Sequence, residues 1–191
     1  MKNLIVIGHP DKNSFCYNGI FKTVKKELEK CNNQKVKVID LYHEDSSIPK
    51  KELINEYQNL VTWSDRLYFI SPVWWFRLTP KTENFFDEVF TPEFAFKFVN
   101  ITKIYAIPKP FLKDKQVRTY ITHGAPALPV ITLYLNSVKL RLVMGVFSFV
   151  FGWKLSLWTK TKQFWSVPAV SEQKRKKYLR TVAKDIKKDI K

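Results

Sequence analysis

The chain has 191 residues, of which 45% are hydrophobic and 15% aromatic, and its net charge is +16. This length suits one domain with one well-filled core, and the hydrophobic content excludes a disordered chain. The positive charge would suit a nucleic acid, but no aromatic residues interleaved with glycine and arginine accompany it, so no nucleic-acid partner is expected.

Cys16 and Cys31 are the only cysteines. If both lie on one helix, they are separated by roughly 22 Å along its axis, which is beyond the reach of a disulfide. No signal peptide is visible, and the apolar run at residues 142–153 is too short to cross a bilayer. These features predict a soluble protein of the reducing cytoplasm. No metal cluster is expected.

The first part of the chain alternates apolar runs with amphipathic segments. Residues 4–8 are typical of a central parallel strand, and residues 15–30 carry apolar side chains every four residues, as a helix does. A second strand is predicted near residues 36–41. A polar loop then leads to a second helix at residues 51–62.

The third strand is predicted at residues 67–70, where Ser71 and Pro72 would end it because proline cannot donate to the next rung of a ladder. Three aromatic residues, at positions 74–76, then stand where turn residues are usual. Thr79 is the predicted N-cap of a third helix with Pro80 at its first position.

The second half continues the alternation. Residues 97–114 are expected to be a long irregular segment, and residues 117–122 a fourth strand. A hydrophobic helix is predicted over residues 130–151 and a fifth strand within residues 153–165, with Ser171 opening a final helix. Five alternations without a linker indicate one domain, residues 1–191, of the α/β class, with a parallel sheet between helices.

Ligands of such a sheet bind at the carboxyl edge of its strands. There, the loop of residues 9–18 runs into a helix amino terminus that suits a phosphate, with Ser14, His9 and Asn18 as further donors. The alternative is an ordinary capped helix. No GxGxxG pattern is present, which argues against a dinucleotide bound in the Rossmann manner.

Two further loops reach the same edge. The aromatic residues at positions 74–76 offer flat walls for a planar ring, although packing in a hydrophobic core explains them equally well. The loop that begins with Thr122, His123 and Gly124 follows the fourth strand. A single histidine in a loop is more often a surface residue than a catalytic one.

Three stretches in this order resemble the NAD(P)H:quinone oxidoreductase (DT-diaphorase-like) family of flavodoxin-like flavoproteins. They are residues 8–18, residues 72–76 with 86–87 and 91–96, and residues 122–125, where His123 and Ala125 depart from the family's Thr-Thr-Gly-Gly turn. The resemblance implies a three-layer flavodoxin-like fold with a five-stranded sheet in the order 2-1-3-4-5. The flavin contacts that it implies are His9, Ser14, Phe15, Asn18, Pro72, Val73, Trp74, Trp75, Phe76, Thr122, His123 and Gly124.

The same resemblance implies a flavin-dependent NAD(P)H oxidoreductase that reduces a quinone or a similar acceptor. The flavin, FMN in preference to FAD, would carry the chemistry, so no catalytic residue is assigned beyond His123 as a secondary candidate. A homodimer is implied, with residues 94–110 at its interface and over the flavin. The alternative is a flavin-bearing regulatory subunit of a membrane transport protein, for which the basic surface would suit an anionic membrane.

Overall fold

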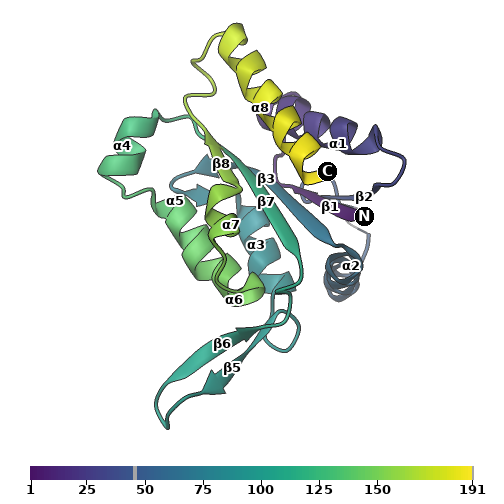
Figure 1. Cartoon of the computed structure of the whole chain (residues 1–191), viewed down its shortest axis with the longest axis vertical. Helices are drawn as coiled ribbons and strands as arrows, with labels where there is room; N and C mark the ends of the chain where they lie inside the picture. Colours follow the sequence, from purple (N-terminus) through teal and green to yellow (C-terminus); the bar gives the residue numbers. More distant parts are fainter. Residues whose placement is uncertain (45–46, 191) are drawn as a thin grey trace.

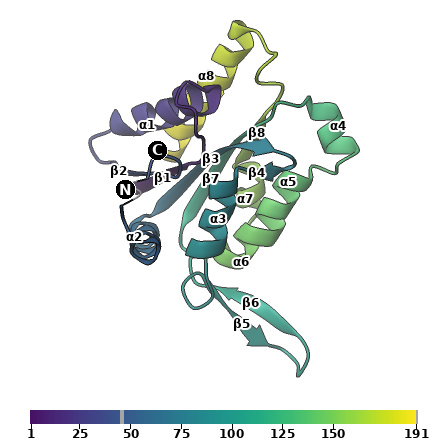
Figure 2. The same cartoon turned by 180° about the vertical axis from the view of Figure 1, so that it is seen from behind.

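The computed structural model describes residues 1–44 and 47–190, so Asp45 and Ser46 of the predicted polar loop lie outside the described residues. Its centre is a parallel sheet (Figures 1 and 2) in the order β2-β1-β3-β7-β8, which confirms the predicted order and the flavodoxin-like α/β class. The strands are β1 (Lys2–Ile7), β2 (Lys35–Asp40), β3 (Arg66–Trp74), β7 (Gln116–Thr122) and β8 (Thr161–Phe164).

Helices cover both faces of this sheet. Successive side chains of β1 point to opposite faces, so Leu4 and Val6 enter one hydrophobic core while Ile5 and Ile7 enter the other. The helices over the second core are η1 (Phe15–Phe21), a π-helix, α1 (Lys22–Glu29) and α8 (Glu172–Ile190). Those over the first core are α2 (Lys50–Trp63), α3 (Pro80–Val89), α5 (Ser137–Leu140), η2 (Arg141–Phe147) and α6 (Ser148–Phe151).

The third strand does not end at Ser71 and Pro72, which corrects the expectation from sequence. β3 continues to Trp74 and pairs with the short antiparallel strand β4 (Arg77–Leu78). Trp75 and Phe76 form the tight turn between them, both with positive φ, at 48° and 57°. Such a turn usually contains Asn and Gly, because side chains are strained in the left-handed region.

Pro72 is tolerated inside β3 for a geometric reason. The backbone groups of Ile70 point toward β1, since the carbonyl of Ile70 accepts from Gly8 N at 2.9 Å. Pro72 lies two residues further on and points to the same side. There, pairing between β1 and β3 has already ended at Ile7 and Ile70, so the missing N–H of proline leaves no rung unmade.

Residues 97–114 are not irregular. They contain a two-stranded hairpin, β5 (Phe96–Asn100) and β6 (Ala106–Pro110), whose base is closed by a hydrogen bond from Phe111 N to Ala95 O. The hairpin projects beyond α6, at the end of the molecule opposite to α4 (Ala127–Thr132) and the amino terminus of α8 (Figures 1 and 2).

Two other elements differ from expectation. The helix predicted over residues 130–151 is broken between α4 and α5, because Leu135 and Asn136 adopt positive φ and Asn136 N bonds back to Val130 O. Gly152, with φ of 77°, ends the second piece. The first half of residues 153–165 is a short helix, α7 (Leu155–Thr159), and only β8 is a strand.

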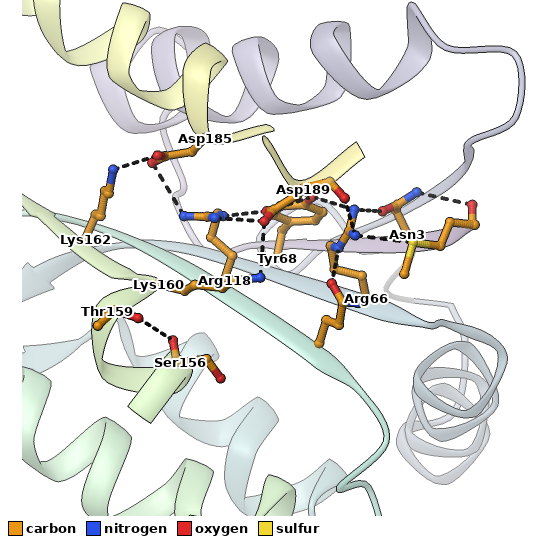
Figure 3. A network of polar contacts seen from close by, with 12 residues as sticks. Asn3, Arg66, Tyr68, Arg118, Ser156, Thr159, Lys160, Lys162, Asp185 and Asp189 are labelled. Atoms are coloured by element: carbon orange, nitrogen blue, oxygen red, sulfur yellow. Dashed lines mark hydrogen bonds and ion pairs between the residues drawn. The ribbon is translucent and has the colours of Figure 1, made fainter. Parts of the chain in front are cut away.

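A buried charge network fastens α8 to the sheet (Figure 3). Arg118 of β7 donates two hydrogen bonds to the Asp189 carboxylate, at 2.6 and 2.8 Å, and lies 3.5 Å from Asp185. Lys160 and Lys162 pair with the same two carboxylates. Burial alone would raise the pKa of Asp189, but its bonds to Arg118 outweigh this and hold the pKa below its usual value.

No helix within residues 1–44 and 47–190 combines the length and the apolar character needed to cross a membrane.

Candidate functional site

The three loops singled out in the sequence do meet around one cavity, of about 460 Å³, at the carboxyl edge of the sheet. This size falls within the range of ordinary cofactor pockets. The residues that line it are His9, Asn13, Ser14, Phe15, Cys16, Pro72, Val73, Trp74, Thr122, His123, Gly124, Val167, Pro168 and Arg175. We call this cavity the main pocket.

The first loop places a helix amino terminus at the main pocket. Ser14 is the N-cap of η1, and its Oγ accepts from Tyr17 N at 3.1 Å. Helix geometry leaves the N–H groups of Phe15 and Cys16 without an intrahelical acceptor, so they suit an anion. Burial raises the pKa of Cys16 to about 12, which keeps its thiol protonated and unreactive. Asn18 is exposed and does not line the pocket.

Only one of the three consecutive aromatic residues enters the main pocket. Trp74 lines it, and its ring lies edge-on to His9 at 6.3 Å. Trp75 is 95% exposed. Phe76 packs against Tyr134, with 4.3 Å between the two ring centroids. Trp75 and Phe76 both belong to the tight turn between β3 and β4, and neither lines the cavity.

His123 is buried, not the surface residue that its position in a loop suggested. Its Nε2 lies 2.9 Å from Gln163 Oε1, which can only accept, so Nε2 carries the proton of the neutral ring. The ring stacks on Trp165 at 4.1 Å. Burial lowers the pKa of His123 to about 4, so the ring is uncharged at neutral pH.

This shift predicts a specific pH dependence of stability. Between about pH 6.5 and pH 4 the unfolded chain binds a proton at His123 that the folded chain refuses, so stability falls as pH falls through that window. The loss attributable to this residue should reach about 3 kcal/mol. Urea unfolding at several pH values should show that the free energy of unfolding falls less between pH 6.5 and pH 4 in His123→Gln than in the wild type. The same pH dependence in both proteins would contradict a buried, neutral His123.

Arg175, Val167 and Pro168 line the main pocket but were missed from the sequence. Val167 and Pro168 belong to a fourth loop, after β8, and Arg175 lies in the first turn of α8, which follows this loop. A hydrogen bond from Val167 N to His123 O joins the fourth loop to the third. The Arg175 guanidinium donates to Val167 O and Pro168 O, while its Nε is buried with no partner among the described residues. The sequence did contain a signal for Arg175, because a basic residue in the first turn of a helix that begins at this sheet edge suits an anion.

The main pocket fits a flavin mononucleotide on two observations. A helix amino terminus and the positively charged Arg175, whose Nη1 pairs with Glu172 at 3.0 Å, line the same cavity and suit a phosphate. A Cβ added to Gly124 would meet nothing within 4 Å, so there is open space against the third loop. Trp74 supplies the aromatic wall.

Comparison with known proteins agrees with this fold. Residues 1–136 match the model of the family described as Flavodoxin-like fold. The structure of Smu.1420 from Streptococcus mutans UA159 is 25% identical, with a TM-score of 0.78 over 97% of this chain and 98% of that one. No curated protein gives a significant match.

Two structures with named activities share the fold at lower identity. The NAD(P)H:quinone oxidoreductase of Methanothermobacter marburgensis is 18% identical, with a TM-score of 0.71 over 97% of both chains. An FMN-dependent NADH-azoreductase of Bacillus anthracis, solved in complex with FMN, is 14% identical, with a TM-score of 0.72 over 98% of both chains. Since the family model spans well over half of the residues, the chain belongs to the flavodoxin-like fold family.

Proposed function

We propose that the protein is an FMN-dependent NAD(P)H oxidoreductase that reduces a quinone or a similar acceptor. One observation carries the proposal: a phosphate-type site, an aromatic wall and an open glycine face line the same cavity at the carboxyl edge of the sheet. Resemblance to solved quinone oxidoreductases and azoreductases supports the choice of activity.

In this proposal each loop has a separate task. The amino terminus of η1, with Ser14, and the Arg175 guanidinium hold the phosphate. Trp74 and the backbone of Pro72 and Val73 orient the ring system from one side, and the turn at Gly124 bounds the other. The bound flavin supplies hydride acceptance from a reduced nicotinamide and onward transfer of electrons.

In this proposal His123 helps to shape the main pocket and contributes no charge to it. A ring that is neutral at pH 7 gives no positive charge to offset negative charge developing in the cavity. Its backbone N–H is already donated to Phe164 O at 2.8 Å. Its hydrogen bond to Gln163 fixes the side chain that lines the cavity between the third and fourth loops.

Analysis of the cofactor and the activity of the purified protein tests the proposal. A yellow preparation that releases FMN on heating, identified by chromatography, and that oxidises NADH or NADPH with an added quinone would support the proposal. Parallel double-reciprocal plots are expected, because both substrates would use the same flavin in turn. Protein that takes up neither FMN nor FAD would refute it, and flavin with negligible turnover would favour the regulatory alternative.

The two neighbouring tryptophans provide a matched pair of variants. Trp74→Ala should weaken FMN binding about tenfold, because it removes a ring from the wall of the cavity, and stacking of this kind contributes about 1 kcal/mol beyond area burial. Trp75→Ala should change the affinity less than about twofold, since its ring is almost fully exposed. Equal losses in fluorescence titrations of the two apoproteins would contradict this assignment.

We also propose a homodimer in which the β5–β6 hairpin contributes to the interface. Figure 1 shows the hairpin at the end of the molecule opposite to the amino terminus of α8, where Arg175 lines the main pocket, so in a dimer the hairpin would cover the pocket of the second copy. Ile104 at its tip is 97% exposed, and Phe98 and Tyr105 are also exposed. Ile104→Asp should therefore shift the protein to monomers in light scattering, while Lys103→Asp beside it should not. A wild-type monomer at all concentrations would refute the dimer.

A further inference from the structure

A second cavity, of about 560 Å³, lies along the open edge of the sheet, beside β8. It is bounded by the segment between α4 and α5, by α7 and β8, and by α8. Four of the residues that line it are lysines, and none is acidic: Ile131, Asn136, Lys139, Trp158, Thr159, Thr161, Lys162, Gln163, Phe164, Trp165, Lys174, Lys177, Tyr178 and Thr181. We call it the lysine cleft.

The charge of the lysine cleft is largely uncompensated. Lys162 pairs with Asp185, but among the described residues no carboxylate lies within ion-pairing distance of Lys139, Lys174 or Lys177. Burial lowers the pKa of Lys139, whose ammonium lies over the Trp158 ring at 4.4 Å. Basic residues gathered in a concave surface raise the local concentration of anions.

The walls of the lysine cleft suit a planar ring as well as an anion. Trp158, Trp165 and Tyr178 all line it. The backbone of β8 adds hydrogen-bonding groups: Phe164 O accepts from His123 N on the β7 side, so the neighbouring Gln163 turns its N–H and C=O to the open edge. Asn136 also lines the cleft, and its buried Oδ1 has no partner among the described residues.

We propose that the lysine cleft is a binding site for a nucleoside phosphate. The base lies against Trp158 and bonds to the edge of β8, and Lys174 and Lys177, one turn apart on α8, bind the phosphates. Two sources share this chemistry: a free mononucleotide, and the adenosine phosphate end of the reduced dinucleotide. In the second case alone, the inference rests on the proposed function.

The lysine cleft and the main pocket share a wall. His123 lines the main pocket, and its two side-chain partners, Gln163 and Trp165, line the cleft. A ligand in the cleft would therefore contact the residues that hold His123 in place. This adjacency connects the two sites physically, whichever source supplies the nucleotide.

Titration calorimetry with ADP on the purified protein tests the site directly. Lys174→Ala/Lys177→Ala should weaken ADP binding by at least about tenfold, because it removes two charge-assisted contacts. Lys176→Ala/Lys184→Ala, which removes the same charge from exposed positions on the same helix, should change it less than twofold. Absence of ADP binding, or equal losses in the two variants, would overturn the proposal.

Inorganic pyrophosphate tests the role of the rings. It should bind more weakly than ADP, and Trp158→Leu should weaken ADP binding without affecting pyrophosphate. Equal affinities for the two ligands would overturn the nucleotide assignment, because the aromatic wall would then contribute nothing. Flavin content, measured separately, distinguishes the failures: protein without flavin that binds ADP refutes only the proposed function.

Steady-state kinetics distinguish the two sources. If the cleft binds the dinucleotide, the Lys174/Lys177 variant should raise KM for NADH or NADPH at unchanged kcat. KM for reduced nicotinamide mononucleotide should stay the same, and ADP should compete with the dinucleotide. If the cleft binds a free nucleotide, ADP affinity should be the same with and without NADH, and the dinucleotide KM should not change. Either pattern supports a nucleotide site.

Discussion

Asp189→Ala is expected to lower the free energy of unfolding by about 3–5 kcal/mol, the usual cost of removing one partner from a buried ion pair. In this variant Arg118 loses both charge-assisted hydrogen bonds, at 2.6 and 2.8 Å, and stays buried beneath α8 with Asp185, at 3.5 Å, as its remaining carboxylate. Lys160 and the hydroxyl of Tyr68 lose the same acceptor. Urea unfolding followed by circular dichroism measures the change.

An exposed ion pair gives the control for this variant. Glu29→Ala removes a pair with Lys25 in which both side chains are about half exposed, so it should cost less than about 1 kcal/mol. Replacing Arg118 by Met together with Asp189 by Leu should recover much of the loss, because no charge is then left buried without a partner. A loss below about 1 kcal/mol in Asp189→Ala would show that water replaces the carboxylate.

Gly8→Ala is expected to cost about 2–4 kcal/mol, because the added Cβ would lie 1.9 Å from Thr82 Oγ1 and 3.0 Å from Thr79 Oγ1. Both hydroxyls are buried where β1 ends against the start of α3. They bond to each other at 2.8 Å, and Thr79 Oγ1 donates to Gly8 O. Relieving the clash therefore breaks bonds that have no water to replace them.

Gly124→Ala is the matched control for Gly8→Ala. Its Cβ would meet no atom within 4 Å, so the free energy of unfolding should change by less than about 0.5 kcal/mol. Thr82→Ala in the Gly8→Ala background should restore part of the loss, which a double-mutant cycle would register as a coupling energy. Additive effects of the two substitutions would show that the clash is relieved by movement of the backbone.

The sheet order and the pocket-forming loops were predictable because their signals are local. Buried parallel strands read as continuous apolar runs, and the amino terminus at Ser14 follows from a turn cluster before a helical repeat. Once the alternation gives the order of strands, the topology brings the loops together without any knowledge of side-chain contacts.

The predictions from sequence are wrong or incomplete where tertiary contacts override the local conformational preferences of the residues. Nothing local shows that Trp75 and Phe76 form a tight turn, since neither residue favours positive φ. Pro72 normally ends a strand, and it is tolerated here only because β1 stops first. Arg175 reaches the main pocket through the pairing of β8 with β7, a contact that a single sequence does not reveal.

The position of the charge network along α8 has a consequence for amide hydrogen exchange. Helices ordinarily fray at both ends, but the last turns of α8 are held to β7 through Asp185 and Asp189. The first turn, which carries Arg175 at the main pocket, has no comparable anchor. Backbone amides near Asp189 should therefore exchange only through global unfolding, whereas those near Arg175 should exchange through local opening. The same helix would then report overall stability at one end and occupancy of the main pocket at the other.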